Sequence, residues 1–317
     1  MTGEAGSHGS SRASIVLTLA IVATQAVLLG ILTAVSGSST LFAETMFSVS
    51  DVGVEVLLLV GLYRSRRPAD EEHPLGYGGE AFYWSLLAAV GLFVGGGVAG
   101  LLQGLASLGH PEPGQGYLFA YLLLFALLLT DGVALVGAVR MLRGRARSAG
   151  RGLAAEFSET TDPAAQTVFA ANAAAVATAP VAVAGLALHQ ATGNGVFDSV
   201  ASILIGLMLI ALALVLMRTD RYLMSAPSAG DEARERIGKL VAAVEGVAGV
   251  ARVTALITGP EQAVVAVRAV FDPGLDRAGV AAAIRRVERM LDARPGIVDA
   301  YVTPVSASDA AAGEAAR

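Results

Sequence analysis

The sequence predicts a membrane protein with an all-α domain of six transmembrane helices, followed by a small cytoplasmic α/β domain. Of its 317 residues, 54% are hydrophobic and 15% are charged, whereas soluble domains carry about 25% charged residues. The charges are also unevenly spread. The first two-thirds of the chain is apolar with arginine-rich breaks, and the last third has the composition of a soluble domain. The chain has no cysteine, which excludes disulfides, thiolate metal ligands and cysteine nucleophiles.

Six stretches reach the roughly 20 apolar residues that a helix needs to cross a bilayer. They cover residues 14–35, 41–62, 82–108, 117–139, 165–188 and 196–217. The first stretch is too long for the core of a signal peptide, so we expect it to be a retained span. The six spans make a transmembrane domain over residues 14–222. We expect the polar residues 1–13 before it to be disordered.

Arginines fall on alternate connections between the spans, all on one side of the membrane, and this sets the orientation. Arg12 precedes the first span, and arginine clusters follow spans two, four and six. The other connections, "SGSST", "GHPEPGQG" and "HQATGNG", contain no Lys or Arg. Because basic loops stay in the cytoplasm, both termini are expected there, with the chain crossing the cell membrane several times.

The third span contains the glycine-rich segment "GLFVGGGVAG". These glycines are either a hinge or a point of close contact with another helix. Small residues let membrane helices approach one another closely, so we favour close contact.

Residues 228–306 predict a separate small domain. A helix, "DEARERIGKLVAAVEG", is followed by two strands that Gly259-Pro260 divides, and then by a second helix and a third strand. The order αββαβ predicts a ferredoxin-like sandwich. It has no phosphate loop and no catalytic cluster, so dimerisation is its expected role. The bases of "RRVER" fit a solvated helix face better than a nucleic-acid surface. Residues 307–317 are expected to be a disordered tail.

The second span carries three carboxylates and a serine on one helical face. Glu44, Ser48, Asp51 and Glu55 are spaced i, i+4, i+7 and i+11. Each charge at the bilayer centre costs about 2.5–3.5 kcal/mol, so the stripe must face other helices or a water-filled path. It forms either a hydrogen-bond network between helices or a path for cations or protons. We favour the path, with Asp51 nearest mid-membrane.

Two more polar side chains lie within the spans. Asn172, in "TVFAANAAAVAT" of span five, either offers an amide oxygen to a cation or bridges helices. Asp131 of span four lies nearer the cytoplasmic end. It either relays protons or pairs with an arginine of the cluster that follows. The sequence leaves both questions open.

The loop after span two, "RRPADEEHPLGYGGE", holds Asp70, His73 and Tyr77. Carboxylate oxygen and imidazole nitrogen suit Zn²⁺, Fe²⁺ or Mn²⁺. Two such ligands do not make a site, so a solvated loop and a second metal site both stand as interpretations.

Several of these stretches resemble the cation diffusion facilitators (CDF), a family that exchanges divalent metal ions for protons. The matching segments include "GLYRSRRPADEEHPLGYGGEAFYWSLLAAVGLFVGGG", "DPAAQTVFAANAAAV", "FDSVASILIGLMLI" and "RPGIVDAYVTP". The resemblance runs from about residue 14 to 306. It implies six spans, cytoplasmic termini and a dimer, either of this chain alone or with another family member.

The resemblance also implies a transport site with two ligands on span two and two on span five. The span-two positions fall on Phe47 and Asp51, and the span-five positions on Val168 and Asn172. Phe47 and Val168 are therefore lost ligand positions, while Asp51 is a retained strong ligand and Asn172 a weak one. In the loop, Asp70 and His73 match the family's second site, and Tyr77 replaces its last ligand. The site is degenerate by this comparison.

Two functions remain in view. The first is a proton-coupled divalent-cation exporter working by alternating access, in which Glu44 and Glu55 join Asp51 and Asn172 in an oxygen-rich site. Its cargo would be Zn²⁺, Mn²⁺ or Fe²⁺, and no resident cofactor is expected. The second is a family relative without transport, which serves as a membrane partner or regulatory subunit. No nucleophile–base pair or cofactor motif is present, so the sequence does not predict an enzyme.

Overall fold

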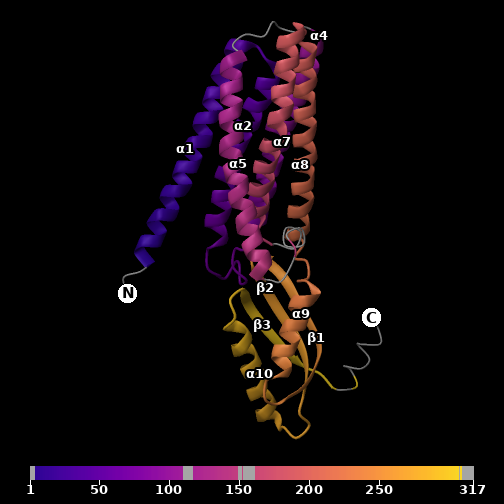
Figure 1. Cartoon of the computed structure of the whole chain (residues 1–317). Coiled ribbons are helices and arrows are strands. Elements are labelled where there is room, and N and C mark those ends of the chain that lie inside the picture. The colour runs from indigo at the N-terminus through magenta and orange to yellow at the C-terminus, as the bar shows by residue number, and fades with distance from the viewer. Residues whose placement is uncertain (1–3, 110–116, 149–151, 153–160, 307, 309–317) are drawn as a thin grey trace. The chain divides into compact units, whose positions relative to one another are not determined.

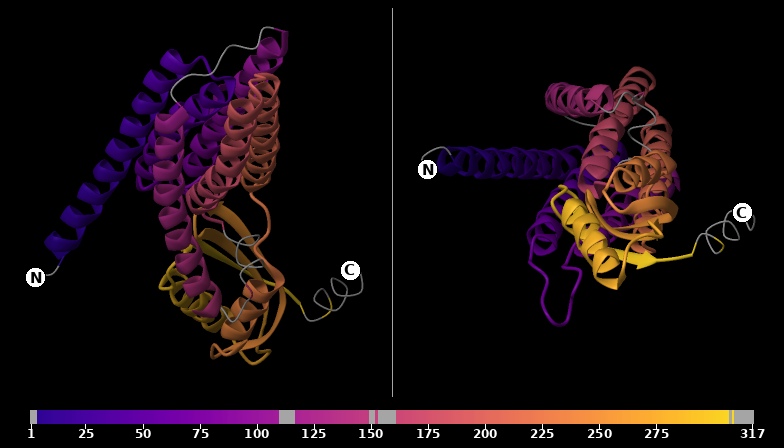
Figure 2. Two further views of the ribbon diagram at one scale, coloured as in Figure 1. Left: turned by 45° about the horizontal axis from the view of Figure 1, so that its top comes forward. Right: turned by 90° about the horizontal axis from the view of Figure 1, so that it is seen from below.

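The computed structural model describes residues 4–109, 117–148, 152, 161–306 and 308. The chain divides into two compact units, which we treat separately. The helical unit comprises Met1–Gly61, Tyr83–Ser158 and Pro163–Asp220 in its described residues. The second unit joins the C-terminal domain from Arg221 onward to Leu62–Phe82 and to the described part of Glu159–Asp162. Figures 1 and 2 show the ribbon coloured along the chain.

The helical unit is built from long apolar helices. Their bounds are α1 Glu4–Ser36, α2 Ser39–Ser65, α3 Glu80–Gly91, η1 Leu92–Val98, α4 Ala99–Gly109, α5 Tyr117–Ser148, α7 Pro163–Thr192 and α8 Val196–Met224. The π-helical segment η1 joins α3 to α4 within one continuous span. In the described part of the chain, five helices are long and apolar enough to cross a membrane, and Val22–Ser36 of α1 is a shorter apolar helix.

The N-terminal segment differs from the prediction. We expected disorder over residues 1–13, but α1 already begins at Glu4. Once the apolar part of a helix exists, each further residue adds a hydrogen bond without a new nucleation cost, so the helix extends into the polar segment. The predicted C-terminal tail, 307–317, lies outside the described residues apart from residue 308.

The glycine-rich segment packs closely against α8. A Cβ on Gly97 would lie 2.6 Å from Cγ1 and 3.1 Å from the backbone nitrogen of Ile210. A Cβ on Gly206 of α8 would lie 2.6 Å from the backbone nitrogen of Leu101. Ser202 also donates a hydrogen bond to the Gly100 carbonyl at 2.9 Å. Close contact, the favoured interpretation of these glycines, is confirmed.

The beginning of α2 is capped by a residue from another helix. The carboxylate of Asp198, in the first turn of α8, accepts hydrogen bonds from the Ser39 amide at 2.8 Å and from the Ser38 hydroxyl at 2.9 Å. A carboxylate stabilises the exposed N–H groups and the positive dipole end of a helix. Gly37, at φ +65°, ends α1 just before it. The turn between α1 and α2 is therefore fixed by α8.

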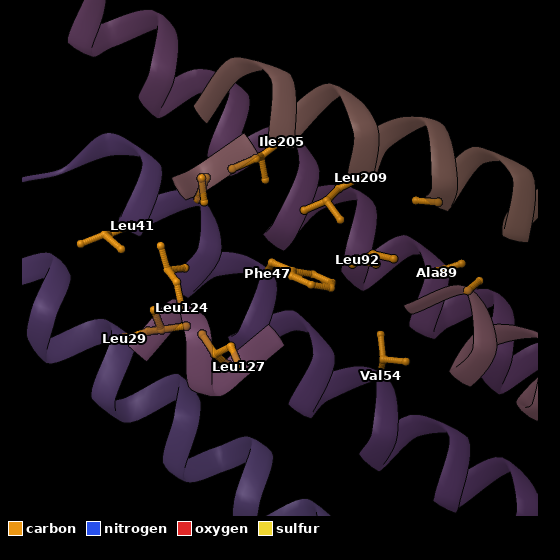
Figure 3. Close-up of a cluster of buried hydrophobic side chains, with 14 of the residues drawn as sticks. Leu29, Leu41, Phe47, Val54, Ala89, Leu92, Leu124, Leu127, Ile205 and Leu209 are labelled. Carbon is orange, nitrogen blue, oxygen red and sulfur yellow. The ribbon is translucent and has the colours of Figure 1, made fainter. Parts of the chain in front are cut away.

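The core of the helical unit lies between α2, the third span and α8. Phe47 is 5% exposed and lies beside Leu92 and Leu209, as Figure 3 shows. Leu29, Leu41 and Leu124 extend the same cluster toward α1 and α5. This packing fixes the rotation of α2, and hence the direction of its polar side chains.

The C-terminal domain contains α9 Asp231–Ala242, β1 Val247–Gly259, β2 Gln262–Phe271, α10 Arg277–Asp292 and β3 Ile297–Pro304. The sheet order is β1-β2-β3, with β2 antiparallel to β1 and parallel to β3. Val241 of α9 and Val287 and Leu291 of α10 pack on Val265 of β2. The predicted order of helices and strands in a small α/β region is confirmed.

Candidate functional site

A cavity of about 700 Å³ lies in the helical unit and receives most of the predicted polar residues. Four helices line it: α1, α2, α5 and α7. Its polar side chains are Gln25, Asp51, Glu55, Thr130, Asp131 and Asn172. The remaining walls are aliphatic, as is usual for binding pockets with a few placed polar groups.

The α2 stripe divides at this cavity. Asp51 and Glu55, one helical turn apart, line it together with Val54 and Leu58. Glu44 does not line the cavity. It is 5% exposed, interacts with Thr178 of α7, and leaves its Oε1 without a hydrogen-bond partner among the described residues. The predicted set is therefore split into a cavity pair and a separate buried carboxyl.

Asp131 faces the same cavity from α5. It forms no ion pair with an arginine in the described part of the chain, so the alternative of an arginine partner is not supported. Beside it, Thr130 accepts a 2.7 Å hydrogen bond from Gln25 of α1. Asp131 thus adds a third carboxylate, from a second helix, to the space that Asp51 and Glu55 occupy.

Asn172 contributes a neutral group to the cavity. Its side-chain NH₂ donates to the Val168 carbonyl of its own helix at 2.7 Å. This bond fixes the amide without bridging two helices. The amide oxygen has no partner among the described residues, and it is the atom able to contact a cation.

The two positions that the resemblance marks as lost ligands, Phe47 and Val168, have different surroundings. Phe47 is buried in the core beside Leu92 (Figure 3) and does not line the cavity. Val168 does line it and is 42% exposed. Only one of the two apolar replacements therefore contributes to the cavity wall.

The carboxylates surround the cavity without converging on one point. Within the described ranges, no three His, Cys, Asp or Glu side chains are grouped so as to hold a metal ion. A cation in this space would keep part of its hydration shell, or the helices would have to move closer around it. Oxygen ligands with water suit hard divalent ions, and carboxylates can also carry protons.

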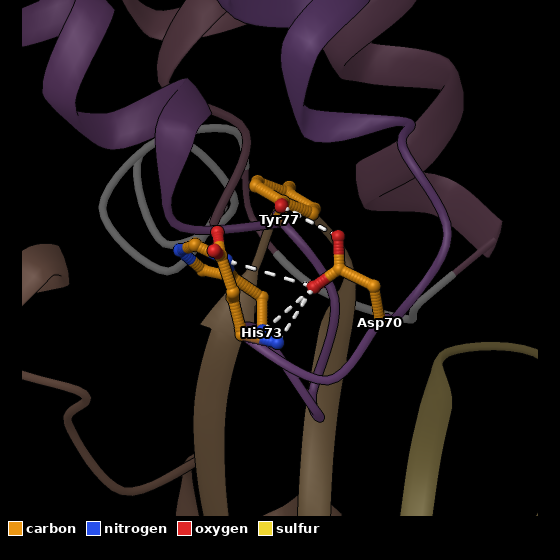
Figure 4. A network of polar contacts seen from close by, with 4 residues as sticks. Asp70, His73 and Tyr77 are labelled. Carbon is orange, nitrogen blue, oxygen red and sulfur yellow. Dashed lines mark hydrogen bonds and ion pairs between the residues drawn. The ribbon is translucent and has the colours of Figure 1, made fainter.

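The α2–α3 loop brings Asp70, His73 and Tyr77 together, as Figure 4 shows. The Tyr77 hydroxyl donates to Oδ2 of Asp70 at 2.7 Å, and the amide of His73 donates to Oδ1 at 2.8 Å. The rings of His73 and Tyr77 stack with centroids 4.0 Å apart, and the Arg67 guanidinium lies 4.3 Å from the centroid of the Tyr77 ring. Both oxygens of the carboxylate already accept hydrogen bonds, so a metal would compete with these bonds for the carboxylate.

These bonds also set the ionisation of the loop. The Tyr77 hydroxyl, helped by the backbone amides of His73 and Glu72, holds the pKa of Asp70 below its usual range. The same hydrogen bond raises the pKa of Tyr77. Asp70 is therefore a carboxylate at neutral pH, and Tyr77 remains protonated.

Sequence reasoning missed a buried polar cluster on three helices. Asp220 of α8 is 2% exposed and accepts a 3.0 Å hydrogen bond from Ser85 of α3, which lies 3.2 Å from the Thr167 hydroxyl of α7. The only signal was an aspartate inside the arginine-flanked segment "MRTDRY". Asp198 lies at the start of span six, and its capping of α2 joins residues far apart in sequence.

Comparison with known proteins identifies the family. Residues 15–224 match the model of the cation efflux transmembrane domain. The chain belongs to the cation efflux family. It is therefore a multi-pass membrane protein of a transporter family, not of an enzyme family, and its resemblance to the CDF family is confirmed.

This cation efflux protein is similar to two named relatives. Human mitochondrial proton-coupled zinc antiporter SLC30A9 is 30% identical over 206 residues, which cover 65% of this chain and 36% of the human protein. Metal tolerance protein C4 of Arabidopsis thaliana is 31% identical over 206 residues, covering 65% and 45% of the two chains. The match thus spans less than half the length of each relative.

Proposed function

We propose that this cation efflux protein exports a divalent metal ion in exchange for protons, by alternating access at the cavity between α1, α2, α5 and α7. The observation that carries the proposal is the meeting of Asp51, Glu55 and Asp131 in one cavity of the helical unit. Charged groups in membrane segments are costly and mark ion or proton pathways. Proton-coupled zinc antiport by the human relative supports the same reaction class.

Asp51 is the central ligand of this proposal. Asn172 supplies an amide oxygen, and Glu55 and Asp131 supply further carboxylate oxygens or carry the exchanged protons. Glu44 lies outside the cavity, and it is proposed as a separate, buried proton carrier. With oxygen ligands only, the site fits Zn²⁺ less well than a His-containing site and favours harder ions such as Mn²⁺. Asp70 and His73 are proposed as a second, weaker metal position.

The setting of this transporter is also proposed. Arginine clusters on alternate connections support six spans in the cell membrane with both termini in the cytoplasm. The C-terminal domain, whose αββαβ order fits a ferredoxin-like sandwich, is proposed to hold two copies of the chain together. Native mass spectrometry of the full chain in detergent checks this by measuring the mass of the assembly.

Two observations favour a second function. Phe47 is buried in the core, and the carboxylates are not grouped to hold a metal in the described residues. A relative without transport, pairing with an active family member, would have these features. Co-purification with such a member and an absence of metal binding by calorimetry would favour this alternative.

Flux into proteoliposomes decides between the two. Vesicles containing the wild type, under a pH gradient, are expected to accumulate Zn²⁺ or Mn²⁺. Asp51→Asn is expected to lower this flux by about tenfold or more. The substitution removes the charge of the central ligand and keeps the shape of the side chain. Glu71→Gln, which neutralises an exposed loop carboxylate, is the matched control and should transport normally. Absence of flux for every divalent ion in the wild type would overturn the proposal.

A further inference from the structure

The cavity between α1, α2, α5 and α7 is larger than a metal ion requires. Its volume is about 700 Å³, whereas a divalent ion with about six waters takes up only about 180 Å³, at about 30 Å³ for each water. Pockets that bind organic molecules usually measure about 300–1,000 Å³. The cavity therefore has the volume of a site for an organic ligand.

Most of the cavity wall is apolar. Such walls add nothing to the binding of a hydrated ion, but they bind the hydrocarbon part of an organic ligand through the hydrophobic effect. Large apolar side chains from three helices contribute to the wall, among them Val22, Val54, Leu58, Leu129, Val133 and Met141. The wall thus favours a ligand with a hydrocarbon body.

On α5 the cavity wall is also exposed to the surroundings of the helical unit. Leu129 and Met141 line the cavity and are about half-exposed, and Val133 is 73% exposed. These residues lie in an apolar helix that is long enough to cross a membrane. A molecule dissolved in the hydrocarbon of the bilayer can reach the cavity past such side chains, whereas a metal ion is not soluble there.

The carboxylates of the cavity have no positive counterpart in the protein. Asp51, Glu55 and Asp131 have neither a hydrogen-bond donor nor a basic partner among the residues that the structure describes. Carboxylates without partners in an apolar space attract a cation. In the same described part of the chain, they are not grouped to coordinate a metal closely. A charge on an organic molecule requires no such close coordination.

We propose that this cavity also binds a lipophilic organic cation, which is a molecule with one positive charge on a mainly hydrocarbon body. The charge lies among Asp51, Glu55 and Asp131, and the body fills the aliphatic part of the cavity. The inference rests on the cavity that the proposed function uses, and it adds a second class of cargo to the divalent ion.

Tetraphenylphosphonium is a suitable test ligand, because it carries one positive charge on a body of phenyl rings. Its binding to the full chain in detergent is measured with radiolabelled compound and with chelator present. Only the binding that excess unlabelled compound displaces is counted. We expect saturable, displaceable binding by the wild type.

Two competitors separate the contribution of the charge from that of the hydrocarbon body. Tetramethylammonium has the charge with little hydrocarbon, and triphenylphosphine oxide has a similar body without a net charge. Each is expected to compete at least about tenfold more weakly than unlabelled tetraphenylphosphonium, because it loses either the apolar contacts or the attraction of the carboxylates.

Two glycines of α5 provide a matched pair of variants. Gly137 lines the cavity and Gly132 does not. A Cβ at either position would meet nothing within 4 Å, so both leave space for a larger side chain. Gly137→Leu reduces the space in the cavity and should weaken tetraphenylphosphonium binding by about tenfold or more, the size of effect that small changes of shape have in a ligand pocket. Gly132→Leu should bind it as the wild type does.

Asp51→Asn tests the charge without changing the space. It is expected to weaken tetraphenylphosphonium binding by about tenfold, because one of the attracting carboxylates is neutralised. Glu71→Gln, in the exposed loop, should leave the affinity unchanged. If Gly137→Leu fails to fold, Asp51→Asn and the two competitors decide.

Absence of displaceable binding in the wild type, or equal affinity in the wild type, Gly137→Leu and Asp51→Asn, would overturn the inference. The binding measurement requires neither metal nor transport, so the two proposals fail separately. Metal flux without displaceable tetraphenylphosphonium binding removes the organic cation and leaves the metal exporter. Binding that depends on Gly137 and Asp51, in a protein that transports no divalent ion, removes the metal exporter and leaves the organic cation.

Discussion

Asp51 and Phe47 lie one turn apart on α2 but have different surroundings. Phe47 packs in the core beside Leu92, while Asp51 lines the cavity. The α2 helix therefore presents its polar stripe to two environments, with Glu55 beside Asp51 and Glu44 buried separately. Besides Asp51 and Glu55 of α2, the cavity has a third carboxylate, which comes from Asp131 of α5.

Neutralising Asp131 tests whether this carboxylate of α5 contributes to the path of the ion. Asp131→Asn is expected to lower metal flux into proteoliposomes by about tenfold, since one of three cavity carboxylates loses its charge. Unchanged metal flux in Asp131→Asn would exclude that residue from the ion's path.

Glu44→Gln, at a buried carboxyl outside the cavity, is expected to alter the pH dependence of flux more than its dependence on metal concentration.

Tyr77→Phe tests the hydrogen bond from Tyr77 to Asp70 in the α2–α3 loop. Loss of the hydroxyl is expected to raise the pKa of Asp70 toward its ordinary value of about 3.9, because the largest stabilising hydrogen bond to its charged form is gone. The pKa of Asp70 is lowered in the folded loop, so its contribution to stability is complete above the ordinary value. That contribution is lost as the pH falls through the lowered value. NMR titration of the Asp70 carboxyl carbon measures this shift. In the control variant Glu71→Gln, the pKa of Asp70 should stay as low as in the wild type.

At the scale of elements, the third span and α8 pack closely against each other. Gly97 and Gly206 bring the two backbones together, and Ser202 bonds across them. At its two ends, α8 also bonds α2 through Asp198, and α3 through Asp220. These contacts fix α8 as the support against which the cavity-lining helices are placed.

Gly206→Ala tests this packing. The added Cβ would lie 2.6 Å from the Leu101 nitrogen and 2.8 Å from the Gly97 carbonyl. We expect a loss of about 1–3 kcal/mol, the usual cost of overpacking, and a lower Tm in detergent. Gly91→Ala is the control, because Gly91 is helical and a Cβ there meets nothing within 4 Å. An equal Tm for the two variants would show that the contact contributes little.

At the scale of the whole molecule, the sequence was sufficient to predict the helices and strands but not the contacts between them. Apolar length predicted the spans, and strand alternation around Gly259-Pro260 predicted the hairpin. Helical spacing placed Glu44 and Asp51 on one face, but it did not show that Phe47 packing would direct only Asp51 into the cavity. The Asp198 cap and the Asp220–Ser85 bond join residues more than a hundred positions apart, and local patterns carry no information on such pairs.

The central claim is that a divalent ion binds in the cavity beside Asp51. The most direct measurement is anomalous diffraction from crystals of the full chain soaked with Mn²⁺ or Zn²⁺, with Asp51→Asn crystals as the control. The account predicts an anomalous peak among Asp51, Asn172 and the Glu55 or Asp131 carboxylates, and its loss in the variant. A cavity without a peak at saturating metal, or a peak that persists unchanged in Asp51→Asn, would contradict it.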